Sequence, residues 1–289
     1  MKAEDVIFYK PYSEEKLRGY LQKEVEAALV SFPYWANRKK ITNVKYGVYN
    51  FVQNRMARIL FVLFAEEQNL MIDFTSGLSS FPNDPIYDFS YGNIAWHIQN
   101  TRVHNRTVLP AEEYVYLPAL IPNRFSKDIW SKRNEKPVGH KRTGYLFTFL
   151  SEDPGKNELS FELQIDAHTI KFLCSLKSQY ADESTKPLYA ESWFWNEFMK
   201  TAKVPQIKLN KLPTLVIAGV ALQKHFGYFA DTDEKANLCY RLYRGKWYEN
   251  REGGGLSFCN GLVQTRIKNA TCPMAALGSF DSVFKNSTV

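Results

Sequence analysis

The sequence lacks the marks of a membrane or exported protein. Its most apolar run, residues 59–65, is far too short to span a bilayer. No long apolar stretch follows the first positive residue, Lys2, as it would in a secretory signal. We therefore expect a cytoplasmic protein with no membrane partner.

The sequence also lacks the short motifs of several large enzyme classes. It contains no GxxxxGK[ST] loop, no GxGxxG, no HExxH and no GxSxG. Its cysteines, Cys174, Cys239, Cys259 and Cys272, have no CxxC spacing and lie among apolar or aromatic neighbours. This pattern predicts reduced core thiols rather than disulfides or a zinc site.

The composition of the 289 residues is that of a globular protein. Hydrophobic residues make up 45% and aromatic residues 15%, and neither an internal repeat nor a low-complexity linker is evident. We therefore expect one compact domain, residues 1–289. The net charge is +7, and a positive field attracts phosphate-rich partners, although it also simply keeps a protein in solution.

Hydrophobic periodicity predicts an α/β (α+β) fold with a central mixed β-sheet flanked by helices and with extra strands in the C-terminal third. Helices are expected from Ser13 to about Val30 and from about Val48 to Gln68, and later over 166–180 and 193–199. Strands are expected over 86–91, 94–103, 114–121, 145–150, 159–165, 215–221, 238–243 and 256–267. The run 215–221 is typical of a buried central strand.

One hairpin concentrates polar residues in a suggestive pattern. Gly92-Asn93 is a two-residue turn signal between two strand-like runs. With this turn, Asp88 is expected to face His97 across the hairpin. His97 and Gln99 are expected to share one face of their strand, because strand side chains alternate.

This arrangement resembles the core of the PD-(D/E)XK nucleases, the fold of many restriction endonucleases, over residues 45–105. In that family an aspartate and an acidic-X-Lys pair on the next strand converge on Mg²⁺ and a water molecule. The resemblance implies that Asp88, His97 and Gln99 are catalytic and that Glu66, Glu67 and Asp88 hold Mg²⁺. His97 stands where the family has an acidic residue, and Gln99 stands where it usually has lysine.

The resemblance gives the leading hypothesis, a Mg²⁺-dependent, type II restriction-like endonuclease that cleaves double-stranded DNA as a homodimer. Carboxylates suit this chemistry, because they hold a hard cation that lowers the pKa of water and polarises the phosphoryl oxygen. The segment 123–142 carries seven Lys/Arg against two Asp/Glu and is expected to grip the phosphate backbone. Its cationic residues are Arg124, Lys127, Lys132, Arg133, Lys136, Lys141 and Arg142.

Other interpretations of the same residues stay open. Asp153 and Glu162-Leu163-Gln164 repeat the spacing of the hairpin residues, with an acidic residue in the middle position. Residues 46–49, Tyr-Gly-Val-Tyr, resemble the first half of a GIY-YIG nuclease signature. An aspartate beside a hairpin is also ordinary in a protein with no such site. The alternative functions are a nucleic-acid-binding protein on a degenerate nuclease core, without catalysis, and a cytosolic interaction protein.

Overall fold

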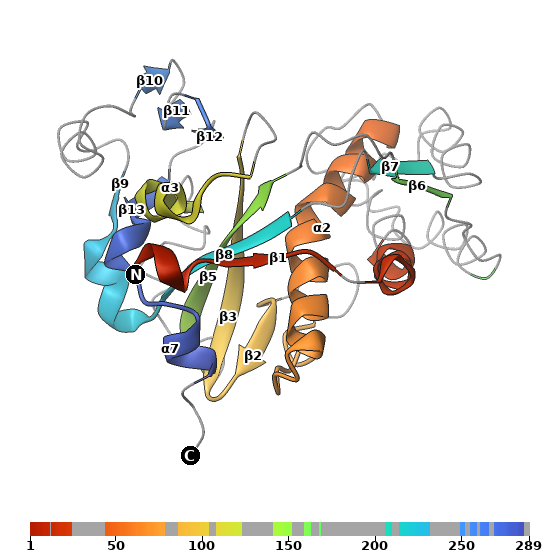
Figure 1. Ribbon diagram of the computed structural model, residues 1–289, viewed down its shortest axis with the longest axis horizontal. Coiled ribbons are helices and arrows are strands. Elements are labelled where there is room, and N and C mark those ends of the chain that lie inside the picture. Colours follow the sequence, from red (N-terminus) through yellow and green to blue (C-terminus); the bar gives the residue numbers. More distant parts are fainter. Residues whose placement is uncertain are drawn as a thin grey trace, which may run out of the picture.

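The structure is a computed structural model (Figure 1). It describes residues 1–11, 13–24, 44–78, 86–103, 108–122, 141–151, 159–162, 168, 206–209, 214–231, 249–251, 255–258, 261–265 and 269–285. Within these ranges, only the backbone is described for residues 44–54 and for several short strands.

The centre of the fold is a five-stranded mixed sheet with the strand order β1-β8-β5-β3-β2. Its strands are β1 (Ile7–Tyr9), β2 (Phe89–Tyr91), β3 (Ile94–Arg102), β5 (Arg142–Ser151) and β8 (Thr214–Ala221). β3 and β5 are parallel, and the other neighbours are antiparallel. Every residue of β8 is buried, as expected for an inner strand covered on both faces.

The helix α2 (Val44–Glu67) covers one face of this sheet (Figure 1). Its residues 59–65 are all buried, so this part of the helix is apolar around its whole circumference and needs partners on every side. Phe61 packs on Phe89 of β2, with ring centroids 5.0 Å apart. The N-terminal helical residues 14–24 bury Leu17 and Leu21 and are joined to α2 by side-chain contacts described below.

The opposite face of the sheet packs against a second layer. This layer contains α3 (Ala111–Tyr116) and a small sheet of β4 (Pro118–Pro122), β13 (Asn269–Pro273) and β9 (Ala230–Asp231). Tyr145, Phe147 and Phe149 of β5 point into the core between the two layers. Cys272 of β13 is buried in the same core, and burial raises the pKa of its thiol.

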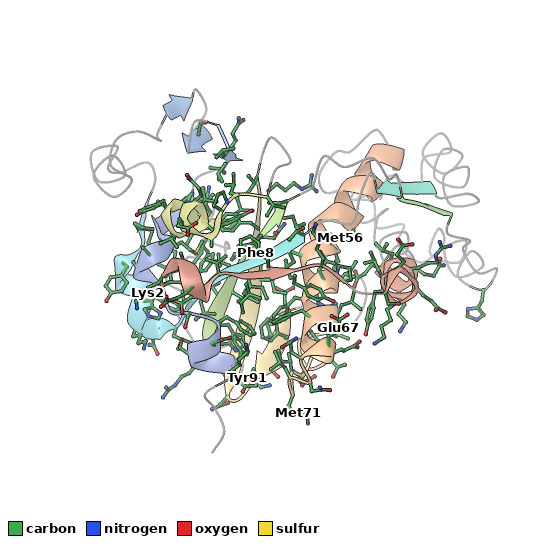
Figure 2. All side chains as sticks on the ribbon, viewed as in Figure 1. Lys2, Phe8, Met56, Glu67, Met71 and Tyr91 are labelled. Carbon is green, nitrogen blue, oxygen red and sulfur yellow. The ribbon has the colours of Figure 1, made fainter. Side chains whose placement is uncertain are left out.

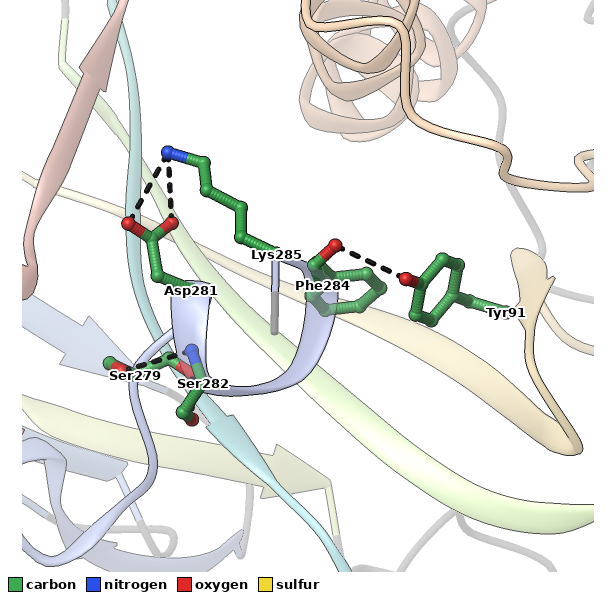
Figure 3. A network of polar contacts seen from close by, with 6 residues as sticks. All are labelled: Tyr91, Ser279, Asp281, Ser282, Phe284 and Lys285. Carbon is green, nitrogen blue, oxygen red and sulfur yellow. Dashed lines mark hydrogen bonds and ion pairs between the residues drawn. The ribbon is translucent and has the colours of Figure 1, made fainter. Parts of the chain in front are cut away.

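The short helix α7 (Asp281–Phe284) closes the turn end of the β2–β3 hairpin. The Tyr91 hydroxyl donates a hydrogen bond to the Phe284 carbonyl at 3.1 Å, and Lys285 forms an ion pair with Asp281 (Figure 3). The Phe284 ring lies 5.0 Å from Trp96. The C-terminal part of the described chain therefore fixes the aromatic face of the hairpin.

The α/β class and most elements predicted from periodicity are confirmed. The second helix, the hairpin strands, the strand at 145–150 and the buried strand at 215–221 all form within a few residues of their expected bounds. The strand expected at 159–165 forms as β6 (Leu159–Glu162), paired with β7 (Gln206–Leu209). The expected first helix is helical over residues 14–24.

Two predicted strands are wrong in part. The first half of 114–121 belongs to the helix α3, because Glu112 and Glu113 occupy a first helical turn, where acidic side chains are favourable. Pro118 then ends the helix, since a proline disfavours helical backbone before it. The expected strand 256–267 is two antiparallel strands, β11 (Gly255–Phe258) and β12 (Val263–Thr265), joined by a turn in which Gly261 has φ 88°.

The C-terminal strands form a separate three-stranded sheet, β10-β11-β12, in which β10 spans Glu249–Arg251. The expected helix at 193–199 and strand at 238–243 lie outside the described residues, as does the helix expected at 166–180 apart from His168. Among the described helices, none is long and apolar enough to cross a membrane.

Gly144 of β5 is expected to be intolerant of a side chain. A Cβ atom there would lie 2.8 Å from the Trp96 ring, which is fully buried and stacked on Phe89. We expect Gly144→Ala to lower the free energy of unfolding by about 1–3 kcal/mol, measured by urea denaturation.

Gly19→Ala is the matched control for this substitution. Gly19 lies in the N-terminal helical residues, and a Cβ atom there meets nothing within 4 Å. Because alanine is the better helix former, this variant should be as stable as the wild type or up to about 1 kcal/mol more stable. Equal losses in the two variants would contradict the packing argument.

Candidate functional site

The β2–β3 hairpin follows the predicted register only as far as Phe89. Tyr91 pairs with Ile94 and Phe89 with Trp96, around a turn in which Gly92 has φ 58°. The Asp88 N–H then donates to the carbonyl of Trp96 at 2.9 Å, the residue that already pairs with Phe89. Asp88 and Phe89 therefore share one partner, which is the pattern of a β-bulge.

The bulge corrects the expectation that Asp88 faces His97. A bulge changes the direction of a side chain relative to simple alternation. The Asp88 carboxylate accepts a hydrogen bond from the Ile98 N–H at 2.7 Å, and the positive groups that act on it are Arg58 and Arg55 of α2. The extra residue of the bulge thus directs the Asp88 side chain toward the α2 side of the sheet.

Two arginines and two carboxylates make up the cluster around Asp88. Glu24 forms ion pairs with Arg58 at 3.3 Å and with Arg55 at 3.6 Å, and the three side chains are only 14–23% exposed. Arg58 also donates to the Phe74 carbonyl at 3.1 Å. We call Glu24, Arg55, Arg58 and Asp88 the arginine cluster, and its formal charges sum to zero.

Burial raises the pKa of Asp88 above its ordinary value. The Ile98 N–H and the two guanidinium groups act in the opposite direction, because they stabilise the charged form, but desolvation is the larger effect. The arginine cluster is therefore an arrangement in which a partly desolvated carboxylate is held by positive groups and one backbone donor.

His97 and Gln99 point away from the arginine cluster. Trp96 stacks on Phe89, which packs on α2, so its neighbour His97 lies on the other face of the sheet. There the His97 ring stacks on Tyr145 with centroids 5.6 Å apart. Burial lowers the pKa of His97 to about 4, so the imidazole is neutral at pH 7. Gln99 shares this face and pairs with Phe147.

Glu66 and Glu67 lie at the C-terminal end of α2, beyond the arginine cluster along the chain. Figure 2 labels Glu67 at this end of the helix. Eight residues separate Glu66 from Arg58, which is about 12 Å along a helix. The Glu66 carboxylate accepts a hydrogen bond from the Tyr20 hydroxyl, and burial together with this contact raises the pKa of Tyr20 to about 12. One Glu67 carboxylate oxygen is buried with no hydrogen-bond partner among the described residues.

The residues that the resemblance assigns to catalysis and to Mg²⁺ are not grouped together among the described residues. Asp88 is acted on by two guanidinium groups, His97 and Gln99 lie across the sheet, and Glu66 and Glu67 lie farther along α2. In the part of the chain that the structure describes, no three His, Cys, Asp or Glu side chains are grouped to hold a metal ion.

The predicted nucleic-acid-binding residues lie mostly outside the described ranges. Lys141 and Arg142 are the exceptions, at the start of β5. Arg142 is exposed, and its backbone N–H donates a hydrogen bond to the Asn93 carbonyl at 3.1 Å. The Lys141 ammonium group lies 5.6 Å from the centre of the Tyr87 ring. The residues outside the described part are Arg124, Lys127, Lys132, Arg133 and Lys136.

The residues of the alternative placements lie only partly within the described ranges. Glu162 ends β6 and pairs with Gln206, whereas Asp153 and Gln164 lie outside the described residues. Residues 46–49, which resemble half of the GIY-YIG signature, lie in the first turns of α2.

Glu24, Arg55 and Arg58 are not among the site residues predicted from the sequence. The signal available for the arginines was their spacing, because residues three apart lie on one side of a helix and both precede a fully apolar run. Nothing local to the sequence indicates that Glu24, which lies on a different helix, is their partner.

The ion pair between Glu24 and Arg58 is expected to matter far more than one on the surface. Glu24→Gln leaves two poorly hydrated guanidinium groups without the carboxylate that pairs with both, so we expect a loss of about 3 kcal/mol in the free energy of unfolding. In the control Lys285→Ala, an ion pair with half-exposed partners is removed, and the loss should be at most about 0.5 kcal/mol. Urea denaturation of both variants checks this difference, and similar losses would contradict it.

The raised pKa of Asp88 predicts a specific pH dependence of stability. Because the folded protein binds this proton more tightly than the unfolded chain, the contribution of Asp88 to stability falls as the pH rises above 3.8. The free energy of unfolding of Asp88→Asn should therefore improve relative to wild type between about pH 4 and pH 7, measured by urea denaturation across this range.

Asp73→Asn provides the control of opposite sign. Hydrogen bonds from Thr75 and Ser76 hold the pKa of Asp73 well below 3.8, so the stability that its charge provides is lost as the pH falls toward that lowered pKa. The Asp73→Asn variant should therefore lose stability relative to wild type as the pH rises from acid values through 3.8. Parallel pH profiles for the two variants would be inconsistent with these assignments.

Comparisons of the chain with protein-family models, with curated proteins and with solved structures find no match. The likeness of residues 45–105 to the PD-(D/E)XK nucleases therefore stays a resemblance, and no family is shown.

Proposed function

We propose that the protein binds nucleic acid through the basic segment 123–142 and does not cleave it at Asp88. The observation that carries this proposal is the charge of the segment, with seven Lys/Arg against two Asp/Glu. Cations at this density neutralise phosphates and release counterions. Phe125 and Trp130 lie within the segment, and aromatic rings stack on exposed bases.

The described end of the segment supports the proposal. Arg142 begins β5 beside the turn of the β2–β3 hairpin and is exposed. A phosphate bound at Arg142 would thus lie near the turn end of the main sheet, where Lys285 directly follows α7.

The arginine cluster supports binding without cleavage at the hairpin. Phosphodiester hydrolysis of the kind implied by the resemblance needs carboxylates free to hold a hard cation. Asp88 instead accepts the Ile98 N–H and is acted on by Arg55 and Arg58. The neutral imidazole of His97, across the sheet, is a poor ligand for Mg²⁺.

The binding proposal predicts a salt dependence that changes with the basic segment. Removing three phosphate contacts by the substitutions Lys132→Gln, Arg133→Gln and Lys136→Gln should reduce the slope of log affinity against log salt by about 0.9 per contact on duplex DNA. Fluorescence anisotropy with labelled duplex and single-stranded oligonucleotides, at several salt concentrations, measures this slope.

A charge-matched variant separates local contacts from net charge. The triple variant Lys2→Gln, Lys16→Gln and Lys224→Gln removes the same charge at exposed positions outside the basic segment. Its slope should stay close to that of the wild type. Equal changes in both triple variants would show that only the overall field matters, and absence of binding at low salt would favour an interaction protein instead.

The Mg²⁺-dependent endonuclease of the restriction type, acting on double-stranded DNA as a homodimer, is the competing proposal. The observation in its favour is that the predicted hairpin forms beside a carboxylate-bearing helix. Its second placement, Asp153 with Glu162 and Gln164, is independent of the arginine cluster.

Cleavage assays distinguish the two proposals. We expect no cleavage when purified protein is incubated with assorted plasmid DNAs and Mg²⁺, because Asp88 is beside positive groups. Gel electrophoresis of the products, with Asp88→Asn and Glu162→Gln prepared in parallel, makes the measurement. Cleavage lost in Asp88→Asn would overturn our proposal, whereas cleavage lost only in Glu162→Gln would move the site to the second placement.

A further inference from the structure

We propose that Asp88 is a structural acceptor that completes the β-bulge at the start of β2, and that it is not a ligand of a divalent cation. This inference concerns the role of one carboxylate in the fold and does not depend on whether the chain binds nucleic acid.

The backbone geometry of the bulge supplies the first reason. Continued pairing beyond Phe89 and Trp96 would give the Ile98 N–H a backbone carbonyl of the neighbouring strand. The extra residue breaks that ladder, and the Asp88 side-chain oxygen takes the place of the carbonyl at 2.7 Å from the Ile98 nitrogen. A half-buried N–H without such an acceptor would be costly.

The charges on α2 supply the second reason. Arg55 and Arg58 already bring two positive charges to the arginine cluster, where Glu24 pairs with both. A divalent cation bound to Asp88 would add two further positive charges to a partly desolvated site. The carboxylates that would offset them, Glu66 and Glu67, lie beyond Arg58 on the same helix.

Two substitutions at one position separate the roles of acceptor and ligand. In Asp88→Asn the side-chain oxygen can still accept from the Ile98 N–H, whereas in Asp88→Ala it is missing. We expect Asp88→Asn to keep the urea midpoint at or above the wild-type value at neutral pH and Asp88→Ala to lower it clearly. Equal midpoints for the two variants would overturn the structural role.

Thermal unfolding with and without MgCl₂ tests the second half of the proposal. A cation bound only to the folded protein raises the melting temperature. We expect any shift caused by MgCl₂ to be the same in wild type, in Asp88→Asn and in the control Asp281→Asn, which removes an exposed carboxylate. A shift that is lost in Asp88→Asn alone would show that Asp88 binds the cation. Neither readout includes nucleic acid, so failure of the binding proposal would be recognised separately.

Discussion

The stacking of Phe89 on Trp96 against α2 is the contact on which the arrangement of the hairpin depends. The two rings are nearly parallel, 5.9 Å apart, and Phe61 of the helix packs on Phe89. Because strand side chains alternate, fixing Trp96 toward α2 places His97 on the opposite face. That face is occupied by Tyr145 and the core of the second layer. Residues of α2 and His97 therefore cannot form one site, because the sheet lies between them.

The bulge at Asp88 is the second constraint. It directs Asp88 toward α2, whereas the first constraint directs His97 away from that helix. It takes Asp88 out of the alternation, so the carboxylate is associated with arginines of α2 rather than with His97. The N-terminal helical residues contribute Glu24 to the same cluster. Three segments far apart in the sequence are thereby joined by charges that balance in a poorly hydrated region. The ion pairs of Glu24 specify this arrangement, because removing Glu24 would leave the arginines without the carboxylate that pairs with them directly.

These two constraints weaken the resemblance to the PD-(D/E)XK nucleases, because they separate the polar residues on which it rests. A hairpin beside a long helix forms, but the polar residues that gave the resemblance its chemistry are divided. His97 and Gln99 lie across the sheet from α2, and Glu66 and Glu67 lie at the C-terminal end of α2, beyond the arginines that act on Asp88. The basic segment does not depend on that division, since its charge is a property of the composition. The proposal that this segment binds phosphates therefore does not require a catalytic site at Asp88.

The sequence by itself determined the α/β class, the long helix, the buried strand β8 and the hairpin turn, because each rests on periodicity or turn chemistry within a short window. It did not determine the helix at 111–116, where local acidic residues and prolines outweighed a strand-like apolar pattern. The faces of Asp88 and His97 were decided only in the tertiary structure. One extra residue in a strand reverses the direction of a side chain. The bulge at Asp88 is held by the packing of Phe89, Trp96 and Phe61 and by the hydrogen bond from Ile98, and the arginines of α2 act on its carboxylate.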